Sequence, residues 1–411
     1  MVSETGKLTA EQKIFLEILQ QTIHKGKYES EGEDIFPYLK EILRLSSIHM
    51  VFPMVVDALY RTYPERMEIY KKSAVKEVTR QAMKTASFVS LYQKMSEEKL
   101  CPSVIKGIVN RNLYHEPELR CSVDEDLFVG SDDINKYHDF LLKQGFQQVD
   151  LDVSLETADE ISYCNPENHL YLEVHKQLFS TEDDIYRDMN KAFKILEEPV
   201  TIRIYDTEIQ SIGYTDHLLY MICHAYKHLI YSGIGIRQLC DMTLFAEAYG
   251  KYIKWNRINE YLDRLNLTVF ARAIMKICVE HLGMDPEKAG CSHLYPLCKI
   301  DELPLLEDIL AGGIYGAQDE NRLHSANMTL TAVSEGKKGK KSKGLRTSIF
   351  PSYAYMSGNF TYLKKYRFLL PLAWMQRIFT YLINTKKDTD PVKSIEIGKQ
   401  RIELLKKYKL L

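Results

Sequence analysis

Short strand-like runs interrupt a chain that is otherwise patterned for helices, and this contrast limits its fold more than any other feature. In residues 1–99, apolar side chains recur three and four positions apart, as in LTAEQKIFLEILQQTI, and the same spacing returns after Ile212. Between these regions lie β-rich runs such as DLFVG, separated by turn residues and short amphipathic helices. The sequence therefore predicts an α+β fold, in which a small mixed-sheet core is flanked by largely helical N- and C-terminal regions.

Three regions follow from these changes of pattern: a helical region at 1–99, an α/β core at 100–210 and a second helical region at 211–411. Within the core, ISYCNPENHLYLEVHKQLF is typical of a hairpin around the turn NPEN. Within the last region, residues 335–346 read EGKKGKKSKGLR, a basic loop with two interpretations. A solvated, mobile loop is favoured because such runs rarely pack, and the alternative is a basic lid over a polyphosphate or a nucleic acid.

The overall charge does not point to a nucleic acid or a membrane surface as the main partner. Lys and Arg number 54 against 56 Asp and Glu, which leaves a net charge of −2. No secretory signal is recognisable, and no apolar stretch has the length of a membrane span. The eight cysteines match no disulfide framework and no common zinc site, so we expect reduced thiols in a cytoplasmic protein. The oligomeric state is not predicted, and local binding of nucleic acid remains open.

The segment RCSVDEDLFV places two carboxylates on what is expected to be a strand entering the core. Side chains two positions apart on a strand point the same way, so Asp124 and Asp126 share one face. Two close carboxylates repel each other, and burying them without compensation is costly. A magnesium ion, which prefers oxygen ligands, is the usual solution. Taken alone, however, a D-x-D pattern favours the simpler interpretation of two surface acids on an edge strand.

Residues on neighbouring elements shift the balance toward a phosphate site. Lys106 and Gly107 end a strand where a helix begins, a position suited to phosphate oxygens. Arg120 precedes the acids by four and six residues. On the later strand LYLEVHKQL, Glu173 and His175 also share a face, and His175 either orders Glu173 by a hydrogen bond or contacts substrate.

This ordered set resembles the uncharacterised nucleotidyltransferase family of the polymerase-beta-like superfamily. The likeness rests on KG, a helix, R-x-x-x-D-x-D-L, a second helix and a strand with E-x-H, and it runs from about residue 85 to 385. The resemblance implies a polymerase-beta-like core that transfers a nucleoside monophosphate from an NTP, with ATP expected, to an acceptor and releases pyrophosphate. It implies Mg²⁺ (or Mn²⁺) on the catalytic residues Asp124, Asp126 and Glu173, and nucleotide binding by Lys106, Gly107 and Arg120.

Two positions depart from the pattern of the wider superfamily. Ile108 follows Lys106-Gly107 where Gly-Ser is usual, which removes a hydroxyl that could hold a phosphate. Glu125 stands between the two aspartates where an apolar residue is more usual, which predicts a less buried face on that side of the strand.

Polar residues on the following helices are candidates for substrate binding. His217, His224 and His228 fall on one helical stripe, and Arg237 and Asp241 lie four residues apart. One interpretation is a polar seam that docks the helices on the sheet, with Arg237 and Asp241 paired across a turn. The other is a cleft wall in which His224, His228, Arg237 and Asp241, with His175, grip the acceptor or the triphosphate.

The leading hypothesis is therefore a metal-dependent nucleotidyltransferase that acts on an unidentified, small hydroxyl acceptor, with a sugar-related compound as one candidate. Transfer of AMP to a protein side chain is the first alternative, and it predicts a labelled protein. A non-catalytic nucleotide-binding module is the second, and three convergent carboxylates argue against it. An RNA-directed transferase is the third, and it predicts RNA binding with a steep dependence on salt.

Overall fold

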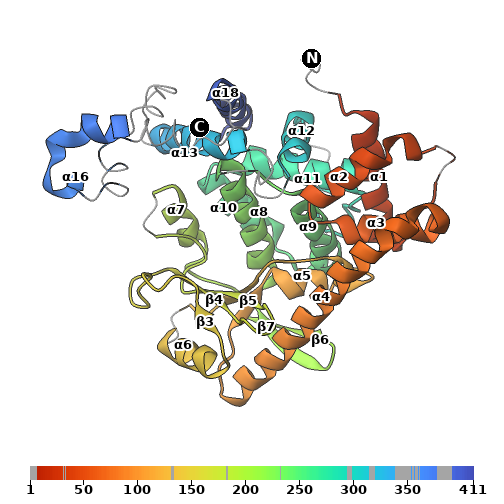
Figure 1. The fold of residues 1–411 in the computed structure, drawn as a ribbon, viewed down its shortest axis with the longest axis horizontal. Helices are drawn as coiled ribbons and strands as arrows, with labels where there is room; N and C mark the ends of the chain where they lie inside the picture. The colour runs from red at the N-terminus through yellow and green to blue at the C-terminus, as the bar shows by residue number, and fades with distance from the viewer. Residues whose placement is uncertain are drawn as a thin grey trace. The chain divides into compact units, whose positions relative to one another are not determined.

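The computed structural model of the chain forms two compact units (Figure 1). The first comprises Met1–Ala225 and Gly235–Leu310, and the second comprises Tyr226–Ile234 and Ala311–Leu411. The structure describes residues 7–30, 32, 34–130, 134–181, 184–231, 233–293, 299–313, 320–337, 353, 356, 360, 362–376 and 391–411. The predicted division of the chain at residues 99 and 210 stays a prediction. The first compact unit contains the sheet together with helices that precede and follow it.

Four helices precede the sheet: α1 (Ala10–Lys25), α2 (Leu39–Ile48), α3 (Phe52–Thr62) and α4 (Pro64–Glu97). Helix α1 is capped at both ends. A capping box between Thr9 and Gln12 caps its N-terminus, and Gly26 in the left-handed conformation caps its C-terminus. The fourth begins with a proline in its first turn and runs for 34 residues without an interior glycine or proline. In Figure 1 this long helix passes diagonally beside the strands.

A five-stranded mixed sheet forms the centre of the first unit. Its strands are β1 (Ser103–Ile105), β2 (Glu125–Phe128), β3 (Gln147–Gln148), β4 (Glu160–Cys164) and β5 (Tyr171–His175), in the order β1-β2-β5-β4-β3. The pair β2–β5 is parallel and the other pairs are antiparallel. The helices α5 (Gly107–Arg111) and α6 (Ile134–Lys143) and the 3-10 turn η2 (Pro117–Leu119) connect the first strands. The predicted α+β fold and the predicted β4–β5 hairpin are confirmed.

A helix and a second, two-stranded sheet follow β5. They are α7 (Asp184–Ala192), β6 (Val200–Ile204) and β7 (Thr207–Ser211), and the two strands pair as an antiparallel hairpin. The sequence analysis did not single out this hairpin, although VTIRIYDTEIQS alternates apolar and polar residues around a two-residue turn. The alternation is the local signal that could have found it.

Helices complete both units. The first unit continues through α8 (Tyr214–Tyr231), within which the boundary between the units falls, and then α9 (Ile236–Tyr249), η3 (Gly250–Tyr252), α10 (Trp255–Arg264), α11 (Thr268–Leu282) and α12 (Leu303–Gly312). In the second unit α13 (Glu320–Lys337) packs against α18 (Pro391–Lys407). The first three residues of the predicted basic loop, 335–337, instead form the end of α13, and residues 338–346 lie outside the described residues.

Two further features of the described part of the chain bear on the sequence analysis. No helix there is long and apolar enough to cross a membrane. The described cysteines form no disulfide.

Candidate active site

The turn between β1 and α5 has an unusual backbone. Lys106 has φ 54° and ψ −128°, and Gly107 has φ +36°. A Cβ on Gly107 would lie 2.0 Å from Oε2 of Glu125, so only glycine lets this turn approach the neighbouring carboxylate. The backbone N–H of Lys106 donates to Nε2 of His217 at 2.9 Å. His217 thus holds the turn from α8, and the sequence analysis noted this histidine only as part of the stripe.

Glu125 is buried, which corrects the expectation of a less buried face. Its exposed fraction is 2 %, and its carboxylate accepts the backbone N–H of Ile108 at 2.6 Å and pairs with Arg111. Arg111 also donates to Ser122 Oγ at 2.7 Å. The sequence could not pair Glu125 with Arg111, because the partner lies on a helix whose packing against β2 is decided in three dimensions. Glu125 thus acts as a buried counter-charge and as the partner of the first turn of α5.

The opposite face of β2 carries the acidic cluster. Asp126 lies on β2 directly across from Glu173 on the parallel strand β5, and His175 follows Glu173 on the same face. His175 Nε2 lies 3.1 Å from Oδ1 of Asp126 and 3.7 Å from Oε2 of Glu173. Asp124 comes two residues before Asp126, just outside the strand, and is half-buried. The sheet register thus brings together residues that are 47 positions apart in the sequence (126 and 173).

Lys106 covers this cluster from the β1–α5 turn. Its Nζ lies 3.1 Å from Asp126 Oδ1 and 3.1 Å from Nε2 of His224 on α8. The same ammonium lies 5.4 Å from the centre of the Tyr220 ring, within the range of a cation–π contact. His217, Tyr220 and His224 therefore form the part of the α8 stripe that faces the lysine. These contacts support the polar-seam interpretation for His217 and His224.

The surroundings shift the pKa values of Asp126 and Glu173 in opposite directions. Burial disfavours the charged form of Asp126, but the Lys106 charge and the hydrogen bond from His175 outweigh it and lower the pKa to about 2. Burial and the neighbouring Asp126 charge raise the pKa of Glu173 to about 7. For Asp124, burial and Asp126 raise the pKa against the opposing charges of Lys106 and Arg237. The cluster therefore combines a permanent anion with a carboxyl group that titrates near neutrality.

His175 is held between acids. Burial alone would lower its pKa, but the hydrogen bond and charge of Asp126, with further contributions from Glu160 and Glu173, raise it overall. Its Nδ1 lies 3.5 Å from Oε2 of Glu160 on β4. With only 4 % of the residue exposed, His175 is placed to orient the carboxylates. Contact with substrate, the other role considered for it, stays a prediction.

The donor atoms of Asp126, Glu173 and His175 lie within 4.8 Å of one another, a spacing that could hold one metal ion. The carboxylates suit Mg²⁺ and Mn²⁺, whereas the imidazole nitrogen suits Mg²⁺ poorly. Nε2 of His175 already faces Asp126, so the carboxylate oxygens are better placed than the imidazole to meet such an ion; metal binding by Asp126 and Glu173 stays a prediction. Asp124 is outside this close group, and its predicted role as a metal ligand remains a prediction.

Arg120 and Asp241 form a buried ion pair next to the site. The Arg120 guanidinium donates through Nε to Asp241 at 3.1 Å and through Nη2 to the second carboxylate oxygen, and Tyr114 OH donates to Asp241 at 2.8 Å. The exposed fractions of Arg120 and Asp241 are 4 % and 3 %. This arrangement favours a structural role that ties α9 to the segment before β2. The predicted contacts of both residues with nucleotide or substrate stay predictions.

The remaining predicted residues are more loosely placed around the cluster. Arg237 on α9 donates to the carbonyl oxygen of Cys121, and its charge lowers the pKa of Asp124, so it lies on the Asp124 side of the site. His228 belongs to the part of α8 in the second compact unit. Its predicted role in substrate binding stays a prediction.

Helix α4 supports the segment that leads into β2, a role that the sequence analysis did not find. Gln81 accepts the backbone N–H of Ser122 at 2.8 Å, and Lys84 Nζ donates to the carbonyl oxygen of Val123 at 3.3 Å. Gln81 is buried on a helix whose sequence is otherwise strongly charged. A buried glutamine on such a helix has no specific sequence signature, because its partner is a backbone group about 40 residues away.

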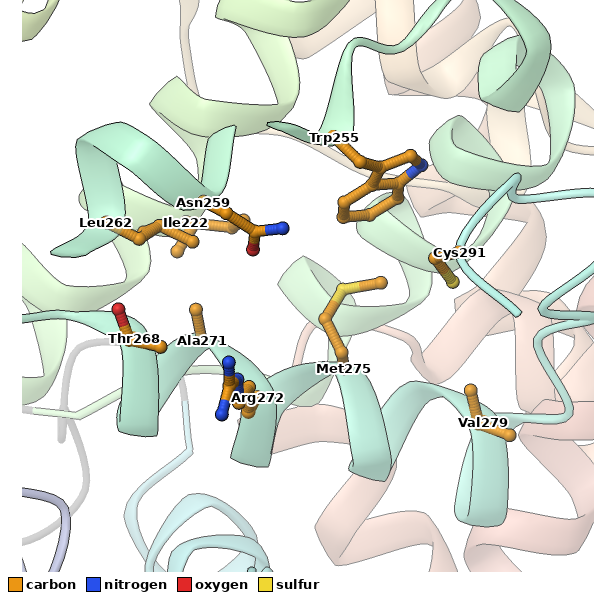
Figure 2. A pocket seen from close by; sticks show the side chains of 10 residues that line it. All are labelled: Ile222, Trp255, Asn259, Leu262, Thr268, Ala271, Arg272, Met275, Val279 and Cys291. Atoms are coloured by element: carbon orange, nitrogen blue, oxygen red, sulfur yellow. The ribbon is translucent and has the colours of Figure 1, made fainter. Parts of the chain in front are cut away.

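Figure 2 shows a different hollow, between helices of the first unit. The residues that line it are Ile222, Trp255, Asn259, Leu262, Thr268, Ala271, Arg272, Met275, Val279 and Cys291. Its volume of 40 Å³ leaves room for only about three water molecules. The Trp255 indole is already fixed by a 2.8 Å hydrogen bond to the carbonyl oxygen of Ala289. This hollow is a packing gap rather than a nucleotide site.

Comparison with known proteins gives one result. A family model described as "Uncharacterised nucleotidyltransferase" matches residues 39–283, which is more than half of the 411 residues. The match begins earlier than the resemblance seen in the sequence and ends before the C-terminal segments. No curated protein and no solved structure is significantly similar to the chain. Because the matched range includes β1, β2, β5 and α8, the chain belongs to the uncharacterised nucleotidyltransferase family and is a transferase of nucleotidyl groups.

Proposed function

We propose that this protein is a metal-dependent enzyme that transfers a nucleoside monophosphate from an NTP, with ATP expected, to the hydroxyl group of a small acceptor. The observation that carries the proposal is the pairing of Asp126 with Glu173 across parallel strands, beneath a lysine from a glycine turn. The acceptor oxygen attacks the α-phosphorus, the bond to the bridging oxygen breaks, and pyrophosphate leaves. Asp124, Asp126 and Glu173 are the residues that would hold Mg²⁺ (or Mn²⁺).

A divalent cation bound there would neutralise the triphosphate and lower the pKa of the acceptor hydroxyl. The chain's own groups supply the remaining functions. Glu173 is 24 % exposed as a side chain, and its raised pKa of about 7 suits a group that accepts the hydroxyl proton near neutral pH. As a general base it would take that proton on a carboxylate oxygen. As a metal ligand it would instead stay ionised.

Lys106 is the cation best placed to meet an incoming phosphate. Its side chain is 17 % exposed, and it bridges Asp126 and His224 at the edge of the cluster. A nucleotide that brings its own counter-ion to Asp126 would free the ammonium to contact phosphate oxygens. The positive φ of Lys106 and the hydrogen bond from its N–H to His217 fix the direction from which the side chain approaches.

The three alternative functions require different features of the protein. A non-catalytic nucleotide-binding module has no need for a carboxyl group whose pKa lies near neutrality beside a permanent anion. AMP transfer to a protein would use the same acids and differs only in the acceptor. An RNA-directed transferase would require a basic surface, and residues 338–346 of the basic segment that suggested it lie outside the described residues. A cytoplasmic location remains a prediction from the sequence.

Calorimetric titration of the four NTPs, with Mg²⁺ and with EDTA, tests the proposal. Wild type is expected to bind at least one NTP in a magnesium-dependent manner, and Asp126→Asn should lose that binding while remaining folded by circular dichroism. Asparagine is close in shape but carries no charge, so the comparison isolates electrostatics. Magnesium-dependent binding that is equal in both proteins would contradict the assignment of Asp126.

A further inference from the structure

A cavity of 660 Å³ lies at the other end of the strands that carry the acidic cluster. Phe128 and Gly130 line it at the end of β2, and Gln177 lines it just beyond β5. Its volume is within the range of sites for small molecules. It is more than ten times larger than the hollow in Figure 2.

The floor of this cavity continues the face of the sheet that bears the acids. Phe128 follows Asp126 by two residues, and its register partner His175 follows Glu173 by two residues. Since alternate residues of a strand share a face and rise by 3.3 Å each, Phe128 lies about 7 Å from Asp126 along the strand, with His175 of the cluster beside it on β5. One small molecule can therefore reach both places.

One side of the cavity is a basic helix face. Arg187, Lys191 and Lys194 recur at positions i, i+4 and i+7 along α7 and the residues just after it, and all three line the cavity. The opposite face of the helix is apolar and buried, through residues such as Ile185 and Met189. Arg187, Lys191 and Lys194 thus make this side of the cavity cationic.

The helix is fixed in this position by polar contacts. The Asn190 side chain accepts the backbone N–H of Phe179 at 3.0 Å and donates to the carbonyl oxygen of the same residue at 2.6 Å. Arg187 Nε donates to the carbonyl oxygen of Thr181 at 3.2 Å. Lys191 pairs with Asp188, but that pair is exposed and therefore weak enough for a dianion to compete with it. The cationic wall is thus built on a rigid element.

We propose that this cavity binds the phosphate of a phosphorylated small acceptor, whose free hydroxyl extends along the sheet to Glu173. The inference rests on the proposed function, because it assigns the acceptor to the same site. The spacing of about 7 Å between Phe128 at the cavity floor and Asp126 suits a phosphorylated sugar or polyol of a few carbons. A cationic wall selects such a monoester over its neutral parent.

The test uses the full chain, with inorganic phosphate, glycerol 3-phosphate and glycerol as probes, in EDTA so that the metal site does not contribute. Saturable binding of both phosphate probes, but not of glycerol, is expected. The double variant Arg187→Gln/Lys194→Gln should weaken it about tenfold. The matched variant Lys72→Gln/Arg264→Gln removes two exposed cations elsewhere and should leave it within twofold. Magnesium-dependent NTP binding should stay within twofold in both variants.

Three outcomes overturn the inference. Wild type that binds magnesium–NTP but neither phosphate probe shows that the cavity is no anion site, while the proposed function stands. If phosphate binding survives in Arg187→Gln/Lys194→Gln but is lost in Lys106→Met, the phosphate binds at Lys106 and not in this cavity. Loss of NTP binding in the double variant assigns the cavity to the triphosphate. If wild type binds no NTP with magnesium, the proposed function itself fails, whatever the phosphate probes do.

Discussion

The two faces of β2 carry consecutive carboxylates that have very different partners. Glu125 points toward α5, where Arg111, Ser122 and the N–H of Ile108 satisfy it fully. Asp126 points toward the cluster, where Lys106 and His175 share one of its oxygens and Glu173 lies beside it. Both residues are buried, so burial alone does not separate them. The partners do. Glu125 pairs with a buried arginine, whereas the network of Asp126 includes the partly exposed side chains of Lys106 and Glu173, which an incoming ligand can reach.

The largest expected effect is on stability at Glu125. Glu125→Gln leaves Arg111 as a buried charge without its counter-charge and should lower the free energy of unfolding by about 3–5 kcal/mol, measured by urea denaturation. Arg111→Met/Glu125→Gln removes that charge while the amide oxygen still accepts the Ile108 N–H, and it should recover at least half of the loss. If Glu125→Gln unfolds within about 1 kcal/mol of wild type, the pair is not structural and the comparison fails.

The next effect is on ligand binding at Asp126. Asp126→Asn should weaken magnesium-dependent NTP binding at least about 100-fold, equal to about 2.7 kcal/mol, and should change the unfolding free energy by less than Glu125→Gln does. Calorimetry and urea denaturation on the same preparations give both quantities. If Asp126→Asn is unfolded and Glu125→Gln loses only NTP binding, then Asp126 is the structural residue and Glu125 the ligand-binding one, which contradicts the comparison.

Gly107 affects both faces of β2. It lies next to Lys106, which contacts Asp126, and it packs against Glu125 on the other face. Gly107→Ala should cost about 2 kcal/mol of stability, because it adds a clash with Glu125 to a positive φ, and it should also weaken NTP binding. Gly32→Ala is the matched control, since Gly32 has φ +100° with no atom within 4 Å of an added Cβ. Equal losses from both variants, measured by thermal unfolding, would show that backbone strain alone matters and that the close approach does not.

The smallest expected effect is a pH dependence on the Asp126 side. The pKa of Glu173 is raised to about 7, so the metal-free native state holds a proton that the unfolded state releases above pH 4.5. Stability should therefore fall between about pH 4.5 and pH 7, by about 1–2 kcal/mol for this partly exposed group. The raised pKa of His175 acts in the same direction. Urea denaturation in EDTA should show a smaller fall for Glu173→Gln, and an unchanged slope would refute this origin.

Patterns within single segments were enough to predict much of the site. The alternation of side chains on a strand places Glu173 with His175 on one face and Asp126 on the face opposite Glu125, because that geometry is local, whereas Asp124 lies just outside β2. The helical spacing on α8 likewise groups His217 with His224. The hairpin of β4 and β5 follows from two β-rich runs around one turn.

The sequence by itself thus determined the class of fold, the family and the faces on which the acids lie. Only the tertiary structure decided which polar side chains meet: Arg120 with Asp241 across 121 positions, Lys106 with His224 across 118, and Glu125 with Arg111 on a buried face. The physical reason is that these pairs depend on how elements pack, and a charged residue has the same local pattern whether its partner is water, phosphate or another side chain. Burial and these partners together set the pKa values: Lys106 and His175 overcome burial and keep Asp126 an anion, whereas burial and the Asp126 charge make Glu173 a group that can exchange a proton.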